Sequence, residues 1–151
     1  MLEVLTQFRV VFRTIRRHYQ DVEQRSGITG ALLWALSEIA GRPGCLPGEL
    51  ARALAIHQST ASNLLRRLEA RGLVIRQRRS GDQRKVQLFA TRKGLKVLKA
   101  APQPLIGVLQ QALSDLPASN LRALHAQLAR LIKAMRIKSP EARTALLSEM
   151  R

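Results

Sequence analysis

The sequence is poor in aromatic residues, which make up only 3% of its 151 positions. Proteins that hold single-stranded nucleic acid stack the bases on aromatic side chains, so this composition argues against that class. A single cysteine, Cys45, excludes an intrachain disulfide framework and a thiolate metal cluster within one chain. Three scattered histidines, His18, His57 and His125, have no metal-ligand spacing. We therefore expect no metal and no cofactor.

Long apolar runs are also missing, since none approaches the roughly 18 residues needed to span a bilayer. The N-terminus has a helical pattern and not that of a signal peptide, so we expect a cytoplasmic protein. No carboxylate pair, nucleophile–histidine pairing or phosphate-binding loop is present, which makes an enzyme the least favoured class.

Acidic residues are scarce, with 10 Asp and Glu against 26 Lys and Arg, and the formal net charge is +16. Such an excess indicates a polyanionic partner, either nucleic acid or an anionic membrane surface. Residues 57–99 contain 12 of the basic residues and two acids, Glu69 and Asp82, and so hold +10 of the net charge. A charge run is often only a solvated face, but this concentration favours a binding site.

Apolar residues recur at spacings of three and four between positions 4 and 22, the pattern of an amphipathic helix. The stripe consists of Val4, Phe8, Val11, Phe12, Ile15, Tyr19 and Val22. Ser26-Gly27 is predicted to end this helix. A second helix over about 28–40 is apolar nearly all round and is therefore expected to be buried.

A short helix is predicted over 47–54, because Pro47 suits a first helical position, where no N–H is needed. A turn follows, and then a polar-fronted helix over about 58–71 with His57 at its N-cap. Gly72 is a good terminator of that helix.

The period then changes to that of strands over 73–78 and 86–90, joined by a basic turn over 79–85. Thr91 is the expected N-cap of a further helix, which the prolines at 102 and 104 should break. Helical patterns resume over 105–113 and 118–137.

The apolar stripes of the terminal helices have no evident partner within a small lobe, which favours a homodimer. The expected organisation is an N-terminal dimerisation helix (1–27), a winged helix-turn-helix lobe (28–91), C-terminal dimerisation helices (92–138) and a short terminal helix or tail (139–151). The fold class is therefore mainly α with a small β-hairpin wing.

In a winged helix-turn-helix protein the second helix of the motif lies in the major groove, where Gln, Asn, Ser and Thr side chains can contact base edges. The candidates for this role are Gln58, Ser59, Thr60, Ser62 and Asn63. Arg66 and Arg67 lie further along the helix and are expected to contact phosphates, which position a protein without specifying sequence.

The hairpin tip carries Arg78, Arg79, Arg84 and Lys85, and a basic tip of this kind can enter a narrow minor groove. Asp82 lies among these cations. It is either an ordinary turn residue or an acceptor that pairs with Arg84 and aims its side chain.

The sequence resembles the MarR (multiple-antibiotic-resistance regulator) family of bacterial transcription factors over about residues 5–137. The resemblance rests on Glu49-Leu50-Ala51, Leu68-Glu69 to Gly72-Leu73, Asp82 with Arg84, and Thr91 with Gly94. Two positions depart from the family pattern. Leu46 stands where a capping Ser or Thr is usual, and Ala90 stands where Leu usually precedes the Thr.

The resemblance implies an obligate homodimer that binds a pseudo-palindromic duplex site, usually as a repressor. It also implies release of DNA by a small aromatic acid, for which the candidate residues are His18, Tyr19 and Trp34. Core packing is the alternative for Trp34, and a surface or dimer contact is the alternative for His18. Cys45 is either an incidental small apolar residue or a redox switch.

Two other functions are also compatible with the sequence. A non-specific architectural protein would bind every duplex equally, whereas a regulator would prefer a palindrome. A membrane-surface protein would use the basic first helix, but the apolar face of that helix also fits a dimer interface.

Overall fold

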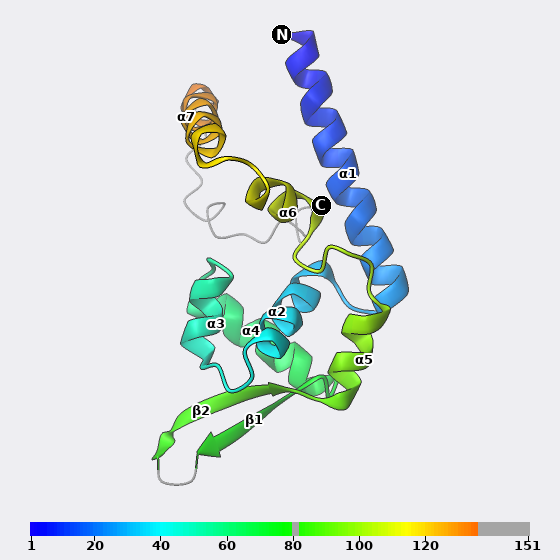
Figure 1. The fold of residues 1–151 in the computed structure, drawn as a ribbon, viewed down its shortest axis with the longest axis vertical. Helices are drawn as coiled ribbons and strands as arrows, with labels where there is room; N and C mark the ends of the chain where they lie inside the picture. Colours follow the sequence, from blue (N-terminus) through cyan, green and yellow to red (C-terminus); the bar gives the residue numbers. More distant parts are fainter. Residues whose placement is uncertain (80–81, 136–151) are drawn as a thin grey trace.

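The computed structural model describes residues 1–79 and 82–135, with the backbone alone described at 79 and 82–85. A lobe of helices and a hairpin forms the lower part of the molecule in Figure 1. The first half of helix α1 and the whole of helix α7 stand above this lobe, at the opposite end from the hairpin.

Helix α1 (Leu2–Ser26) is longer than the predicted span and ends at Gly27, whose φ of 70° lies in the left-handed region that glycine adopts readily. Helix α2 (Gly30–Gly41) follows and is buried along most of its length, as its apolar composition predicts. It begins two residues later than expected because Thr29 has an extended backbone, while Ile28 is already buried in the core.

Helices α3 (Pro47–Ala53) and α4 (Gln58–Ala70) form the helix-turn-helix, and Pro47 occupies the first turn as predicted. The N–H of Leu46 donates to Oε2 of Glu49 across 2.8 Å. Leucine has no side-chain acceptor, so α3 has one half of a capping box and lacks the reciprocal bond.

Strands β1 (Val74–Arg79) and β2 (Asp82–Ala90) pair in antiparallel fashion and form the wing. Both strands extend beyond the predicted limits, so most of the predicted turn over 79–85 is strand instead. The pairing register explains the difference, because Arg79 already faces Asp82. Cys45 makes an isolated bridge to Leu88, in which the N–H of Leu88 donates to the Cys45 carbonyl across 3.0 Å.

Helix α5 (Arg92–Ala100) begins at Thr91, whose hydroxyl accepts a hydrogen bond from the N–H of Gly94, as expected of an N-cap. The prolines end it as predicted. Helix α6 (Val108–Ser114) starts three residues later than the predicted 105, since Gly107 has a φ of 100° and cannot continue a helix. Helix α7 (Ala118–Ala134) matches the last predicted helix, while Ile137 and the predicted terminal helix lie outside the described residues.

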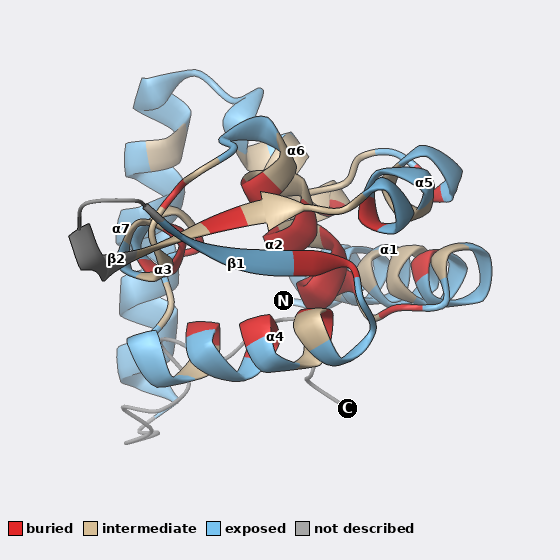
Figure 2. Cartoon of the chain, turned by 90° about the horizontal axis from the view of Figure 1, so that it is seen from below, coloured by how far each residue is buried: buried red, intermediate tan, exposed pale blue. Residues whose placement is uncertain are grey.

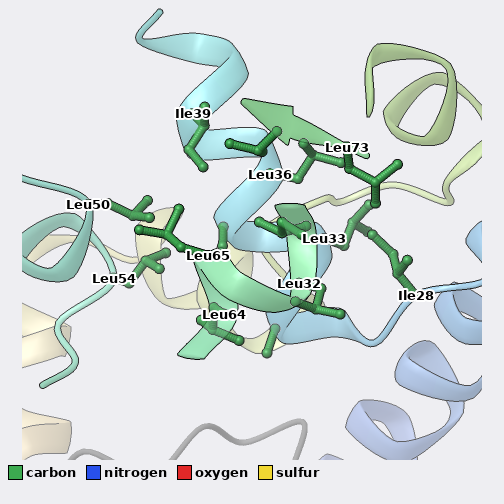
Figure 3. Close-up of a cluster of buried hydrophobic side chains, with 14 of the residues drawn as sticks. Ile28, Leu32, Leu33, Leu36, Ile39, Leu50, Leu54, Leu64, Leu65 and Leu73 are labelled. Atoms are coloured by element: carbon green, nitrogen blue, oxygen red, sulfur yellow. The ribbon is translucent and has the colours of Figure 1, made fainter. Parts of the chain in front are cut away.

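The core lies between α2, α3 and α4, and Figure 3 shows leucine and isoleucine side chains from these helices in one cluster. Leu32, Leu36, Leu65 and Leu68 are completely or almost completely buried. Truncating one such side chain to alanine typically costs about 2–5 kcal/mol. This core fixes the position of α4 and leaves the opposite face of the helix to solvent.

Candidate nucleic-acid interface

Helix α4 has one buried face and one exposed face (Figure 2). Ala61, Leu64, Leu65 and Leu68 point into the core and are at most 1% exposed. Their spacing leaves Ser59, Ser62, Asn63 and Arg66 on the opposite face. The same periodicity that anchors the helix therefore presents its polar side chains to solvent.

The predicted base-reading residues lie together on the first two turns of α4. Gln58, Ser59, Ser62 and Asn63 are exposed, and Thr60 is half-buried. Arg66 is exposed on the next turn, and Arg67 is half-buried. His57 is at the N-cap as predicted, but its side chain makes no capping bond.

The wing lies beside α4, and an ion pair joins them. Nε of Arg76 on β1 lies 2.7 Å from Oε1 of Glu69 on α4, and both side chains are partly exposed. Sequence reasoning missed this pair, because a carboxylate on a helix and an arginine on a strand show no common period. The Leu-Glu-x-x-Gly-Leu junction was the signal that could have indicated it.

Of the predicted wing cations, Arg78 is exposed. The side chains of Arg79, Asp82, Arg84 and Lys85 lie outside the described residues. The backbone register shifts between the Arg78–Val86 and Arg79–Asp82 pairs, so residues 83–85 have no partner on β1. A bulge of this kind bends the strand and increases its local twist.

The candidate effector residues are only partly brought together. A groove of about 690 Å³ lies beside α1 and the start of α6, and Arg13, Arg17 and His18 line it. Burial lowers the pKa of His18 below its usual 6.5, an effect that a hydrogen bond to the backbone of Pro104 partly offsets. The remaining residues along the groove are Val10, Thr14, Gln20, Asp21, Gln24 and Val108.

The other two candidates lie outside this groove. The Tyr19 hydroxyl accepts a long hydrogen bond of 3.5 Å from Nε2 of Gln110 on α6. Trp34 is half-buried and packs against the core cluster, which is the alternative that sequence analysis gave for it.

Cys45 is only 7% exposed, and burial raises the pKa of its thiol. Among the described residues no group of three or more His, Cys, Asp or Glu side chains is placed to hold a metal ion. None of the described helices is both long and apolar enough to cross a membrane.

A short bracing helix, a helix with an exposed polar face and an antiparallel basic hairpin define a winged helix-turn-helix protein. Residues 26–85 match the family model described as MarR family. The matched segment contains the helix-turn-helix and the first part of the wing, and it includes most of the motifs on which the sequence resemblance rests. A comparison with curated proteins found no match.

Solved structures of the same fold cover most of the chain. The Staphylococcus aureus protein MepR, described as a transcription regulator of the multidrug efflux pump MepA, is 25% identical with a TM-score of 0.57, over 85% of this chain and 96% of that one. An S. aureus MepR–DNA complex is 23% identical with a TM-score of 0.59, over 89% and 98% of the two chains. The transcriptional regulator SlyA is 22% identical with a TM-score of 0.52, over 88% and 91%.

Proposed function

We propose that this protein is a sequence-specific duplex-DNA-binding transcription regulator. The exposed polar face of α4 is the observation that carries the proposal. Ser59, Ser62, Asn63 and Arg66 recur at helical spacing on a helix whose other face is locked in the core. A rigid helix that offers such side chains to solvent suits the major groove, and one MepR structure of this fold is a complex with DNA.

Binding to DNA then divides between two kinds of contact. The side chains of the first two turns of α4 read base edges, while Arg66 and the wing cations neutralise phosphates. Because the segment 57–99 has a net charge of +10, electrostatic attraction supplies much of the affinity. The function is therefore one of binding rather than catalysis, and we place it in the cytoplasm, with the chromosome.

We also propose that the working form is a homodimer. Val4 and Phe12 on α1 are 53% and 62% exposed, and Leu128 and Ile132 on α7 are 37% and 59% exposed. The first half of α1 and the whole of α7 stand apart from the DNA-binding lobe in Figure 1. Large apolar side chains exposed along these helices are suited to an interface, and two copies would present two α4 helices to a pseudo-palindromic site.

The groove beside α1 supports a regulatory site for a small aromatic acid, which would make the protein a repressor released by its effector. A volume of about 690 Å³ suits a small organic ligand, and Arg13, Arg17 and His18 suit a carboxylate. Benzoate is a simple probe for this site. It should release bound DNA from the wild type, less so from Arg17→Gln, and normally from Arg9→Gln, which removes an α1 arginine outside the groove.

Selection of bound duplexes from a random pool tests the main proposal. We expect a pseudo-palindrome, with each good base contact worth about 1–3 kcal/mol of discrimination. Asn63→Ala and Ser62→Ala should lose preference between sites, and Arg84→Ala should weaken binding strongly. Arg66→Ala should weaken binding to all duplexes alike. Equal affinity for every duplex would contradict the proposal and identify a non-specific architectural protein.

A further inference from the structure

Three hydrogen bonds connect the C-terminal end of α4 to other elements. This end lies opposite to the base-reading turns. The guanidinium of Arg71 donates through Nη1 to the carbonyl of Gly27, where α1 ends, across 2.8 Å. Nζ of Lys93 on α5 donates to the Arg71 carbonyl across 2.8 Å. The hydroxyl of Thr91 donates to the Gly72 carbonyl across 2.7 Å.

These bonds lie where α4 has few internal partners of its own. The last carbonyls of a helix lack intrahelical donors, and a Schellman turn at Gly72 satisfies two of them, those of Glu69 and Leu68. Lys93 supplies a donor to the carbonyl of the C-cap residue Arg71, at the negative end of the helix dipole. Neighbouring elements therefore complete the C-terminal end of α4.

The residues that bond to this end of α4 belong to α1 and α5, the helices that connect the DNA-binding lobe to the rest of the chain. Gly27 closes α1, and Lys93 lies in the first turn of α5, which packs against α1 and α2. The backbone of α5 at Gly94 also packs directly against the backbone of Leu73, since a Cβ atom at Gly94 would overlap the Leu73 carbonyl oxygen. The joint of Gly27, Arg71 and Lys93 thus connects α4 to both exits from the lobe.

We propose that Arg71 is a positioning residue that fixes the direction of α4 relative to α1, and thereby the separation of the two recognition helices in the dimer. The inference rests on the proposed dimeric DNA-binding function. Arg71 itself lies beyond the base-reading turns, at the C-cap of a 13-residue helix. It would set which spacing of half-sites the dimer accepts, without reading any base.

Half-site spacing is the property that separates this role from a plain phosphate contact. One base pair inserted between half-sites turns one relative to the other by about 35°, since about 10 base pairs make one turn. A rigid dimer rejects such a site, whereas a dimer with a loosened joint can follow it. In Arg71→Ala the ratio of affinities for the original and the lengthened site should fall about fivefold or more.

The experiment measures the affinity of full-length protein for the selected operator, for the operator lengthened by one base pair and for a single half-site. Arg71→Ala should bind the single half-site within about threefold of the wild type, because Arg71 lies beyond the base-reading turns and its guanidinium is bonded to the Gly27 carbonyl. Lys93→Met should relax the spacing preference in the same direction. Arg66→Ala is the control that removes an equal charge from α4 and should lower all three affinities alike.

An Arg71→Ala protein that loses affinity equally for all three duplexes would overturn the inference and make Arg71 a phosphate contact. Unchanged affinities for all three would overturn it as well. A wild type without any operator preference would instead contradict the proposed function.

If the wild type shows no operator preference, a measurement without DNA decides the role of Arg71. Spin labels at Gln7→Cys on α1 and Ser62→Cys on α4, in a Cys45→Ala background diluted with unlabelled protein, report the α1–α4 distance. The distance distribution should broaden in Arg71→Ala, and an unchanged distribution would refute the positioning role.

Discussion

The Arg76 guanidinium contacts the Glu69 carboxylate, with Nε and Oε1 2.7 Å apart, and this ion pair connects the base of the wing to the second half of α4. The two side chains are 41% and 29% exposed, so solvent screens the pair and its contribution to stability is small. Its geometric effect is larger, because it joins the wing to the helix that we propose as the recognition helix.

Replacing Glu69 with glutamine should therefore change specificity more than stability. Arg76 would lose its partner and become available to any nearby phosphate, so affinity for random duplex should rise while the ratio of operator to random affinity falls. The free energy of unfolding should change by less than about 1 kcal/mol. Fluorescence anisotropy with both duplexes at one salt concentration measures the ratio.

Glu3→Gln is the control for this change, since it removes an exposed acid of the same charge at the far end of α1. It should leave the ratio of operator to random affinity unaltered. An unaltered ratio in Glu69→Gln as well would show that the ion pair does not couple the wing to α4.

The second prediction concerns Gly94, whose first-turn position in α5 lies directly against the backbone of Leu73. Adding a methyl group here would overlap the Leu73 carbonyl oxygen and crowd a Leu36 methyl group 3.1 Å away. Gly94→Ala should therefore lower the free energy of unfolding by about 1–3 kcal/mol. Denaturant unfolding monitored by circular dichroism measures the loss.

Gly48→Ala is the matched control for Gly94→Ala, because a Cβ at Gly48 in α3 would meet nothing within 4 Å. That variant should be neutral or slightly more stable, since alanine reduces the freedom of the unfolded chain. Equal effects of the two substitutions would argue against a packing requirement at Gly94.

Much of the fold could be predicted from the sequence because the spacing of apolar residues within single segments determined it. The all-round apolar composition of α2 predicted its burial, and the stripe on α4 predicted which residues face solvent. The Thr91 cap followed from residue type alone. Each of these features depends on residues that are near one another in the chain.

The features that escaped prediction depend on segments that meet only in three dimensions. Arg71 reaches Gly27 across 44 positions, and Lys93 reaches Arg71 across 22, so no local pattern marks either bond. The late start of α6 likewise reflects the positive φ of Gly107, which residue type permits but does not require. The groove beside α1 depends on how α6 returns to that helix.

The third prediction concerns salt, because the net charge of +10 over 57–99 should make DNA binding strongly electrostatic. A dimer that neutralises on the order of ten phosphates should lose roughly a thousandfold or more in affinity between 50 and 200 mM salt. Arg66→Ala should reduce the slope of log affinity against log salt by about 0.9 for each phosphate that the variant no longer neutralises. A flat salt response would contradict the electrostatic basis of the interface.

The last prediction concerns pH, since burial holds the pKa of His18 below its usual 6.5. On unfolding, the imidazole returns to water and to its ordinary pKa, so between these two values the unfolded chain binds more protons than the folded chain. The stabilisation from neutral His18 is therefore fully present above pH 6.5 and is lost as the pH falls through the folded pKa. The melting temperature should therefore fall as the pH is lowered from 7.5 to below the folded pKa of His18.

His18→Gln should melt with a weaker pH dependence than the wild type over this range, because glutamine cannot be protonated. His125→Gln, which removes an exposed histidine on α7, should retain the wild-type dependence. If His18 also faces the proposed effector, a bound carboxylate would favour the imidazolium, so benzoate should bind more tightly at acidic pH and should take up protons as it binds. Identical melting profiles for His18→Gln and the wild type would contradict the assignment of the pH dependence to this side chain.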